Sequence, residues 1–227
     1  MTLPASAGIA GFLLADSRLP SGAYSHSAGL EPAVIAGLEV DGVYPYLLSR
    51  LHTVIRVEAA AAVLAHRAAN ATVPTGFDRL ESALDARTPS AAQRDASRRL
   101  GRGMLRLAAK LAPGHPAVVE LQRTVPKPTR PVALGVTAAA LGVGELELAR
   151  LCCYDDAQSV VAAALKLLPI DPMEATAWIL RAAEEIDVVA AESLRIKTPH
   201  DIPALSAPWM EHWAEDHTIR TRRLFVA

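Results

Sequence analysis

Four side chains that can exchange protons lie close together near the start of the chain: Tyr24, Ser25, His26 and Glu31. Serine, histidine and a carboxylate are the groups that nucleophilic catalysis uses. Neighbours in a turn rarely form the required line of hydrogen bonds, so we favour helix capping and partner contact over catalysis. For His26 alone, a structural role and a functional contact both stay open.

A turn and a helix start must position this cluster. Pro20 fixes its own φ, and Gly22 admits a backbone conformation closed to most residues, so residues 19–23 are predicted to form a tight turn. A helix is expected over about 27–38, and the hydroxyl oxygen of Ser25 or Ser27 is expected to cap it.

Other chemistry-bearing residues are sparse. His212 and His217 are too few for a stable metal site, so we interpret them as surface or interface histidines. Cys152 and Cys153 are adjacent, and we expect buried, reduced thiols. The sequence has none of the spacings typical of phosphate-binding loops, zinc hydrolases, structural zinc sites or hydrolase nucleophiles. We therefore predict no catalytic, cofactor-binding or metal-binding residue, and a protein that is not an enzyme.

Basic residues recur at helical spacing within the predicted helix 91–111. They are Arg94, Arg98, Arg102 and Arg106, joined by Arg99 and Lys110. No interleaved aromatic residue offers base stacking, which disfavours nucleic acid. A solvated face, pairing with acidic helices of the same chain, and binding of an acidic partner remain as interpretations.

The composition indicates the fold class. Of 227 residues, 51% are hydrophobic but only 4% aromatic, which favours closely packed helices rich in alanine and leucine. We predict an all-α, single-domain helical bundle over residues 1–227, with roughly eight to ten helices. The formal net charge of −1 excludes a global basic field.

Apolar periodicity and turn residues predict the elements. Helices are expected at 7–15, 27–38, 44–69, 77–86, 91–111, 132–141, 145–168 and 172–195. The proline-rich stretch 113–131 is interpreted as a surface excursion. Glu58 falls on an apolar helix face, where a paired carboxylate is favoured over a functional acid. Asp171 and Pro172 are the expected N-cap and first residue of the last of these helices.

The segment 197–227 is predicted to be a mobile, partner-docking tail, because Pro199, Pro203 and Pro208 interrupt it. Trp209 and Trp213 could share one face of a short helix. The ending mixes apolar and basic residues, as interfaces do, although packing on its own domain is an equal alternative. Residues 1–17 are the N-terminal segment, and the first thirty residues show no signal-peptide or membrane-spanning pattern, so we expect a cytoplasmic protein.

The segment Leu19-Pro-Ser-Gly-Ala-Tyr-Ser-His-Ser-Ala-Gly-Leu-Glu31 resembles the N-terminal signature of the UreF family of urease accessory proteins. The resemblance continues through Arg94, the Gly101 region, Leu165–Pro169 and His217–Ala227. It implies a dimeric chaperone or adaptor that binds UreD (also called UreH) and the GTPase UreG, and helps to deliver nickel to the urease apoprotein. Neither a nucleic acid nor a membrane is an expected partner.

Carried over by position, the resemblance implies partner contacts at both ends of the chain. These residues are Pro20, Gly22, Tyr24, Ser25, His26, Glu31, Arg220, Arg223, Leu224 and Phe225. The alternatives are a small helical enzyme that uses His26 and Glu31, and a helical nucleic-acid-binding protein.

Overall fold

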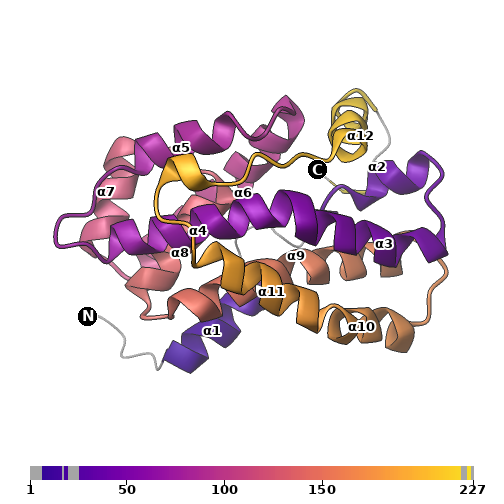
Figure 1. Ribbon diagram of the computed structural model, residues 1–227, viewed down its shortest axis with the longest axis horizontal. Helices are drawn as coiled ribbons and strands as arrows, with labels where there is room; N and C mark the ends of the chain where they lie inside the picture. Colours follow the sequence, from indigo (N-terminus) through magenta and orange to yellow (C-terminus); the bar gives the residue numbers. More distant parts are fainter. Residues whose placement is uncertain (1–6, 17, 20–25, 221–223, 226–227) are drawn as a thin grey trace.

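The computed structural model describes residues 7–16, 18–19, 26–220 and 224–225. Within these ranges the regular structure is entirely helical (Figure 1), which confirms the predicted all-α class. The α-helices are α1 (Ala7–Ala15), α2 (Leu30–Ile35), α3 (Val40–Arg50), α4 (Arg56–Ala69), α5 (Phe77–Asp85), α6 (Ala91–Leu111), α7 (Pro116–Thr124), α8 (Arg130–Ala140), α9 (Glu145–Leu167), α10 (Pro172–Arg181), α11 (Ala183–Ser193) and α12 (Pro208–Thr218).

Helices α4 and α8 cross at the centre of the molecule (Figure 1), and small residues allow their close approach. Ala59 to Ala62 of α4 are buried, and Gly135 of α8 lies so near them that a Cβ there would overlap the carbonyl oxygen of Ala62. Gly101 of α6 meets the backbone of Pro128 and Thr129 in the same way. These glycines therefore serve close backbone packing, and α6 runs through Gly101 without a break.

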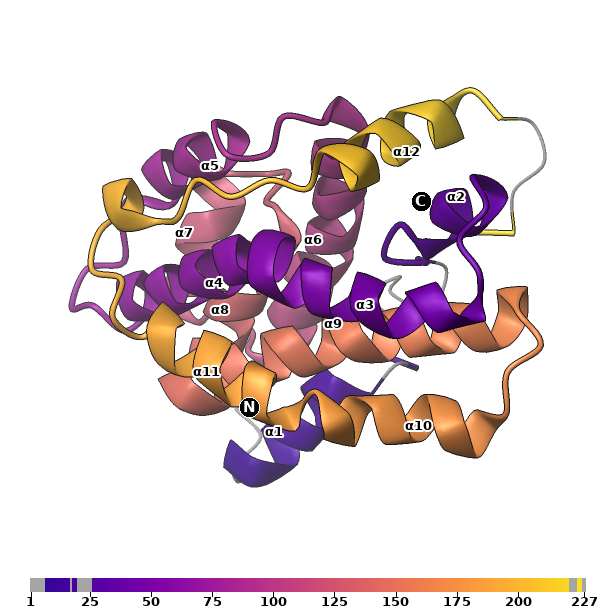
Figure 2. The ribbon, with the colours of Figure 1, turned by 45° about the vertical axis from the view of Figure 1, so that its right-hand side comes forward.

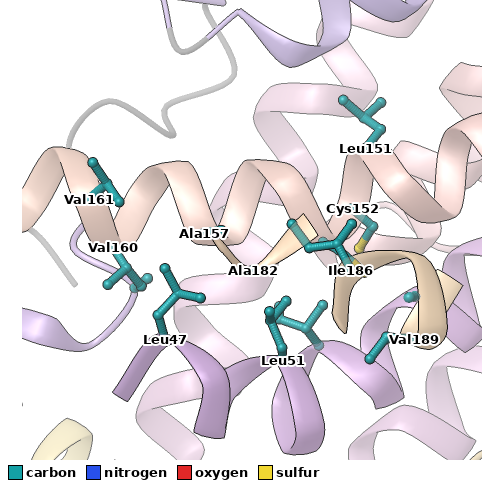
Figure 3. Packing of buried hydrophobic residues seen from close by; sticks show 14 of the residues in the cluster. Leu47, Leu51, Leu151, Cys152, Ala157, Val160, Val161, Ala182, Ile186 and Val189 are labelled. Atoms are coloured by element: carbon teal, nitrogen blue, oxygen red, sulfur yellow. The ribbon is translucent and has the colours of Figure 1, made fainter. Parts of the chain in front are cut away.

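Two buried clusters extend from this crossing. One lies where α9 packs against α3, α10 and α11, and Figure 3 shows Leu47, Leu51, Val160 and Ile186 meeting there. The other joins α4 to α5, α6, α7 and α8. Aliphatic side chains dominate both clusters, as the composition predicts. Cys152 and Cys153 are free and buried in the first cluster, and burial raises the pKa of the Cys152 thiol to about 12.

The predicted helix 44–69 is interrupted by a π-helical turn, η2 (Leu51–Ile55), between α3 and α4. An extra residue in a helical turn rotates the side chains that flank it. Arg50, the last residue of α3, is only 7% exposed and points into the protein. The turn thus joins two helices whose buried faces differ in direction.

Two further predictions were wrong in detail. The stretch 113–131 is more than a surface excursion, because it contains α7, whose Ala117, Val118 and Leu121 are buried. The predicted helix 172–195 divides at Ala182 into α10 and α11, and both parts pack against α9. The Asp171 cap is confirmed, since its carboxylate accepts a hydrogen bond from Met173 N at 2.9 Å.

The C-terminal segment packs along the body, although its prolines led us to expect a mobile tail. After α11 it passes α5 through the 3-10 turn η3 (Pro199–Asp201) and enters α12, which contacts α6 and α2 (Figure 2). Ile202, Met210 and Phe225 are buried. Pro199 and Pro208 are the first residues of η3 and α12, a position that tolerates proline, so they begin helical turns here and do not prevent docking. In the described part of the chain, no helix is both long and apolar enough to cross a bilayer.

Candidate functional site

The Glu31 carboxylate joins the first part of the chain to its end. One oxygen accepts a hydrogen bond from Leu224 N at 2.6 Å, and the other accepts one from Phe225 N at 3.0 Å. The second oxygen also lies 3.1 Å from Nε2 of His217 on α12. The side chains of Glu31 and His217 are only 5% and 4% exposed. A single buried carboxylate therefore contacts two segments that are nearly two hundred residues away in sequence.

The backbone before α2 holds Glu31 in place through a strained bend. Ala28 has φ 51°, which is unusual for a residue other than glycine, and Gly29 follows with φ 75°. Nδ1 of His26 accepts a hydrogen bond from Ala28 N at 3.0 Å, and the Tyr46 hydroxyl donates one to Ala28 O at 2.9 Å. Two side chains thus hold the bend from which α2 starts.

Local electrostatics suit His26 to this structural role. Burial, together with the nearby positive charges of Arg50 and Arg130, lowers the pKa of His26 to about 4. The imidazole is therefore neutral at physiological pH, so that Nδ1 keeps the lone pair that accepts the Ala28 hydrogen bond. Burial also raises the pKa of Tyr46 to about 12, which keeps its hydroxyl a donor.

Arginine–carboxylate pairs lie beneath the bend. Arg50 binds both oxygens of Asp156 on α9, at 2.8 and 2.5 Å. Arg130 pairs with Asp155 and, at 3.4 Å, with Glu58. The predicted pairing of Glu58 with an arginine of another helix is thereby confirmed. Bidentate pairs of this kind fix helix orientation, and burial makes breaking one of them costly.

A cavity of about 390 Å³ opens between these pairs and the C-terminal segment. Its lining includes His26, Arg50, Glu58, Arg130 and His217. The arginines are engaged by carboxylates, and the imidazole accepts from its own backbone, so no side chain among these is placed as a nucleophile. Among the described residues, no three His, Cys, Asp or Glu side chains gather as metal ligands. The arrangement is suited to holding segments together.

Further contacts secure the C-terminal segment to α5 and α6. The Glu215 carboxylate of α12 accepts hydrogen bonds from the Ser90 hydroxyl at 2.7 Å and from Ala92 N at 3.0 Å, at the start of α6. Arg87 donates to the carbonyl oxygens of Ile202 and His200. Trp209 and Trp213 share one side of α12, with ring centroids 6.2 Å apart, as their spacing predicts.

The structure brings only some of the predicted contact residues together. Glu31, Leu224 and Phe225 meet, with Leu224 exposed and Phe225 buried. His26 supports the bend before Glu31. Arg220, which follows the end of α12, forms an exposed pair with Asp216 of that helix. Pro20, Gly22, Tyr24, Ser25 and Arg223 lie outside the described residues.

Sequence reasoning missed other residues of this site. No signal in one sequence pairs Arg50 with Asp156, because they lie on different helices. His217, which we interpreted as a surface or interface histidine, does not lie on the surface, since it is buried against Glu31. The serine cap was also wrong for Ser27, because α2 follows Gly29 without a side-chain cap. Packing of the ending on its own domain, which we kept as an equal alternative, is confirmed for Phe225, whereas partner contact stays a prediction.

Comparison with known proteins identifies the family. A family model described as UreF matches residues 40–183. The chain is similar to the urease accessory protein UreF of Mycobacterium sp. (strain JLS), at 37% identity over 94% of this chain and 96% of the relative. The UreF proteins of Mycobacterium marinum and Mycobacterium tuberculosis H37Rv are 35% and 34% identical over the same shares. The chain therefore belongs to the UreF family of urease accessory proteins.

Proposed function

We propose that this chain is a cytoplasmic adaptor that bridges UreD (UreH) and the GTPase UreG during assembly of the nickel metallocentre of the urease apoprotein. As a member of the UreF family it is a urease accessory protein, with a role in urease maturation and not itself a catalytic enzyme. The bridging roles come from the family resemblance, and the site described above supports them.

The observation that carries the proposal is the junction at Glu31. It fixes the C-terminal segment against α2, so that the exposed side chains of this segment are held on the body of the protein. Apolar side chains remain uncovered on the docked segment: Trp209 is 71% exposed, Ile219 79% and Leu224 63%. Exposed aromatic and aliphatic residues beside arginines are typical of protein interfaces. We infer that UreD binds here, with Leu224 in contact and Glu31 and Phe225 as positioning residues.

Deletion of Arg220 to Ala227 tests this assignment. The helical body should keep its fold, because its two cores lie almost wholly outside the deleted residues. Capture of purified UreD should fall strongly. The matched control is Asp216→Asn, which removes the exposed ion pair to Arg220 and leaves the ending in place. Equal capture of UreD by the truncated and full chains would reject the tail as its docking site.

A homodimer is the expected assembly, and α10 offers a surface for it. Met173 is 81% exposed and Leu180 78% exposed, and they lie seven residues apart on one side of this helix. Two such uncovered side chains on a rigid helix suit a self-complementary contact between two copies. Leu180→Glu should shift sedimentation toward the monomer, whereas Val73→Glu, at another exposed apolar position, should not. A dimer unaffected by Leu180→Glu would place the interface elsewhere.

The maturation role is tested in cells. Urease structural and accessory genes are co-expressed with and without this chain, and the nickel content and activity of purified urease are measured. The proposal predicts urease with little nickel and little activity when the chain is absent. Equal nickel content and activity in both preparations would reject the proposed role.

A further inference from the structure

Helix α6 carries four cations along its outer side: Arg99, Arg102, Arg106 and Lys110. We call this set the α6 basic face. Its members are spaced by three, four and four residues, so they form one row about 16 Å long at 1.5 Å per residue. The opposite side of the helix is buried through Met104, Leu105 and Ala108, among others. Arg102 is half-buried, and the other three cations are exposed.

The structure separates this face from the other arginines of the predicted row. Arg98 turns toward α5, where it lies 2.6 Å from the Asp85 carboxylate. Arg94 donates to the carbonyl oxygens of Thr88 and Pro89. The pairing within the chain that we considered for the row thus accounts for Arg94 and Arg98, and leaves the α6 basic face to be explained.

Within the described ranges, the α6 basic face has no carboxylate at ion-pair distance. The residues outside these ranges include no Asp or Glu that could supply one. On α6 itself, Asp95 is the single carboxylate; it lies four residues before Arg99 but forms no ion pair with it, and the positions three and four residues from Arg102 and Arg106 carry no acid. Like charges at this spacing destabilise a helix, so the row is maintained against a local cost.

We propose that the α6 basic face binds an acidic segment of a protein partner, most simply a helix with carboxylates along one side. Guanidinium groups bind carboxylates in a planar, two-bonded geometry, and a row spanning three helical turns matches carboxylates repeated every three or four residues. Nucleic acid fits less well, because α6 has no aromatic side chain for stacking and the whole chain has a net charge of −1.

Two synthetic helical peptides of equal length and charge test the proposal. One carries its glutamates along a single side, and the other has them distributed around the helix. Affinity is measured for the full chain and for Arg102→Glu/Arg106→Glu, with Arg79→Glu, an exposed arginine of α5, as the matched control. Circular dichroism confirms that each variant keeps its helical content.

The one-sided peptide should bind at least about fivefold more tightly than the distributed peptide, and its affinity should fall with salt. Arg102→Glu/Arg106→Glu should weaken the affinity for the one-sided peptide at least about tenfold, and Arg79→Glu should weaken it less than about twofold. Equal affinity for the two peptides, equal effects of the two variants, or tighter binding of a DNA duplex of the same charge would each overturn the proposal.

Discussion

Replacing Glu31 with glutamine should release the end of the chain from the body. The carboxylate accepts hydrogen bonds from two backbone N–H groups and faces His217, all in a buried setting. Glutamine has nearly the same shape but offers a single oxygen. Its NH₂ group would face one of the two backbone N–H donors and could not accept a hydrogen bond from it. The substitution therefore changes charge and hydrogen bonding while conserving volume.

The magnitude follows from the contacts that are lost. A hydrogen bond to a charged group stabilises by about 1.5–3 kcal/mol, and an unpaired buried donor adds a desolvation cost. Because glutamine keeps one acceptor, we expect tail docking to weaken by about 2–4 kcal/mol. Amide exchange in the tail, where it occurs through local undocking, should then accelerate by about 30- to 1000-fold.

Hydrogen–deuterium exchange of peptides from 208–220 and of the amides of Leu224 and Phe225 measures this effect. Helices α4 and α8 should keep their protection, because the lost contacts lie outside the central crossing. Asp216→Asn is the control, and its exposed ion pair should contribute less than about 1 kcal/mol. Unchanged exchange at Leu224 and Phe225 in Glu31→Gln would refute the reasoning.

Three further predictions concern the stability of the body. Burial raises the pKa of Glu81 from 4.5 to about 7. The contribution of Glu81 to the free energy of unfolding is therefore full below pH 4.5 and is lost as the pH rises through 7, a loss worth roughly 3 kcal/mol at alkaline pH. Urea unfolding of Glu81→Gln should lack this loss. Asp156→Ala should reduce the free energy of unfolding by about 3–5 kcal/mol, and Arg50→Met/Asp156→Leu should recover most of it; no recovery would contradict a pairing role. Gly135→Ala should lower the melting temperature, because its Cβ would overlap the Ala62 carbonyl; an unchanged value would show that α4 and α8 can separate without cost.

The fold class and most helices could be predicted from the sequence, because alanine-rich periodicity and the caps of helix starts are local signals. The helix 91–111 and the Asp171 cap are examples. The π-helical turn after Arg50 could not be predicted, because it is accompanied by contacts with distant helices, such as the pairing of Arg50 with Asp156, that no local signal encodes. The break at Ala182 could not be predicted either, because it lets both α10 and α11 pack against α9, which is a tertiary contact.

The candidate site was predictable at its two ends and not at its centre. The turn before Glu31 and the mixed ending predicted partner contacts, which stay predictions, and each signal is contained within a few residues. The contact between them is a tertiary interaction, in which the Glu31 carboxylate accepts a hydrogen bond from Phe225 N. The role of His217 follows only from that contact, because a lone histidine on a short helix is equally compatible with the surface.

The central claim, that Glu31 fixes the C-terminal segment as a docking surface, is tested most directly by the affinity of the full chain for purified UreD. We predict that Glu31→Gln weakens this binding at least about tenfold, while Asp216→Asn changes it less than about twofold. Wild-type affinity in Glu31→Gln, together with the faster tail exchange expected above, would contradict the claim.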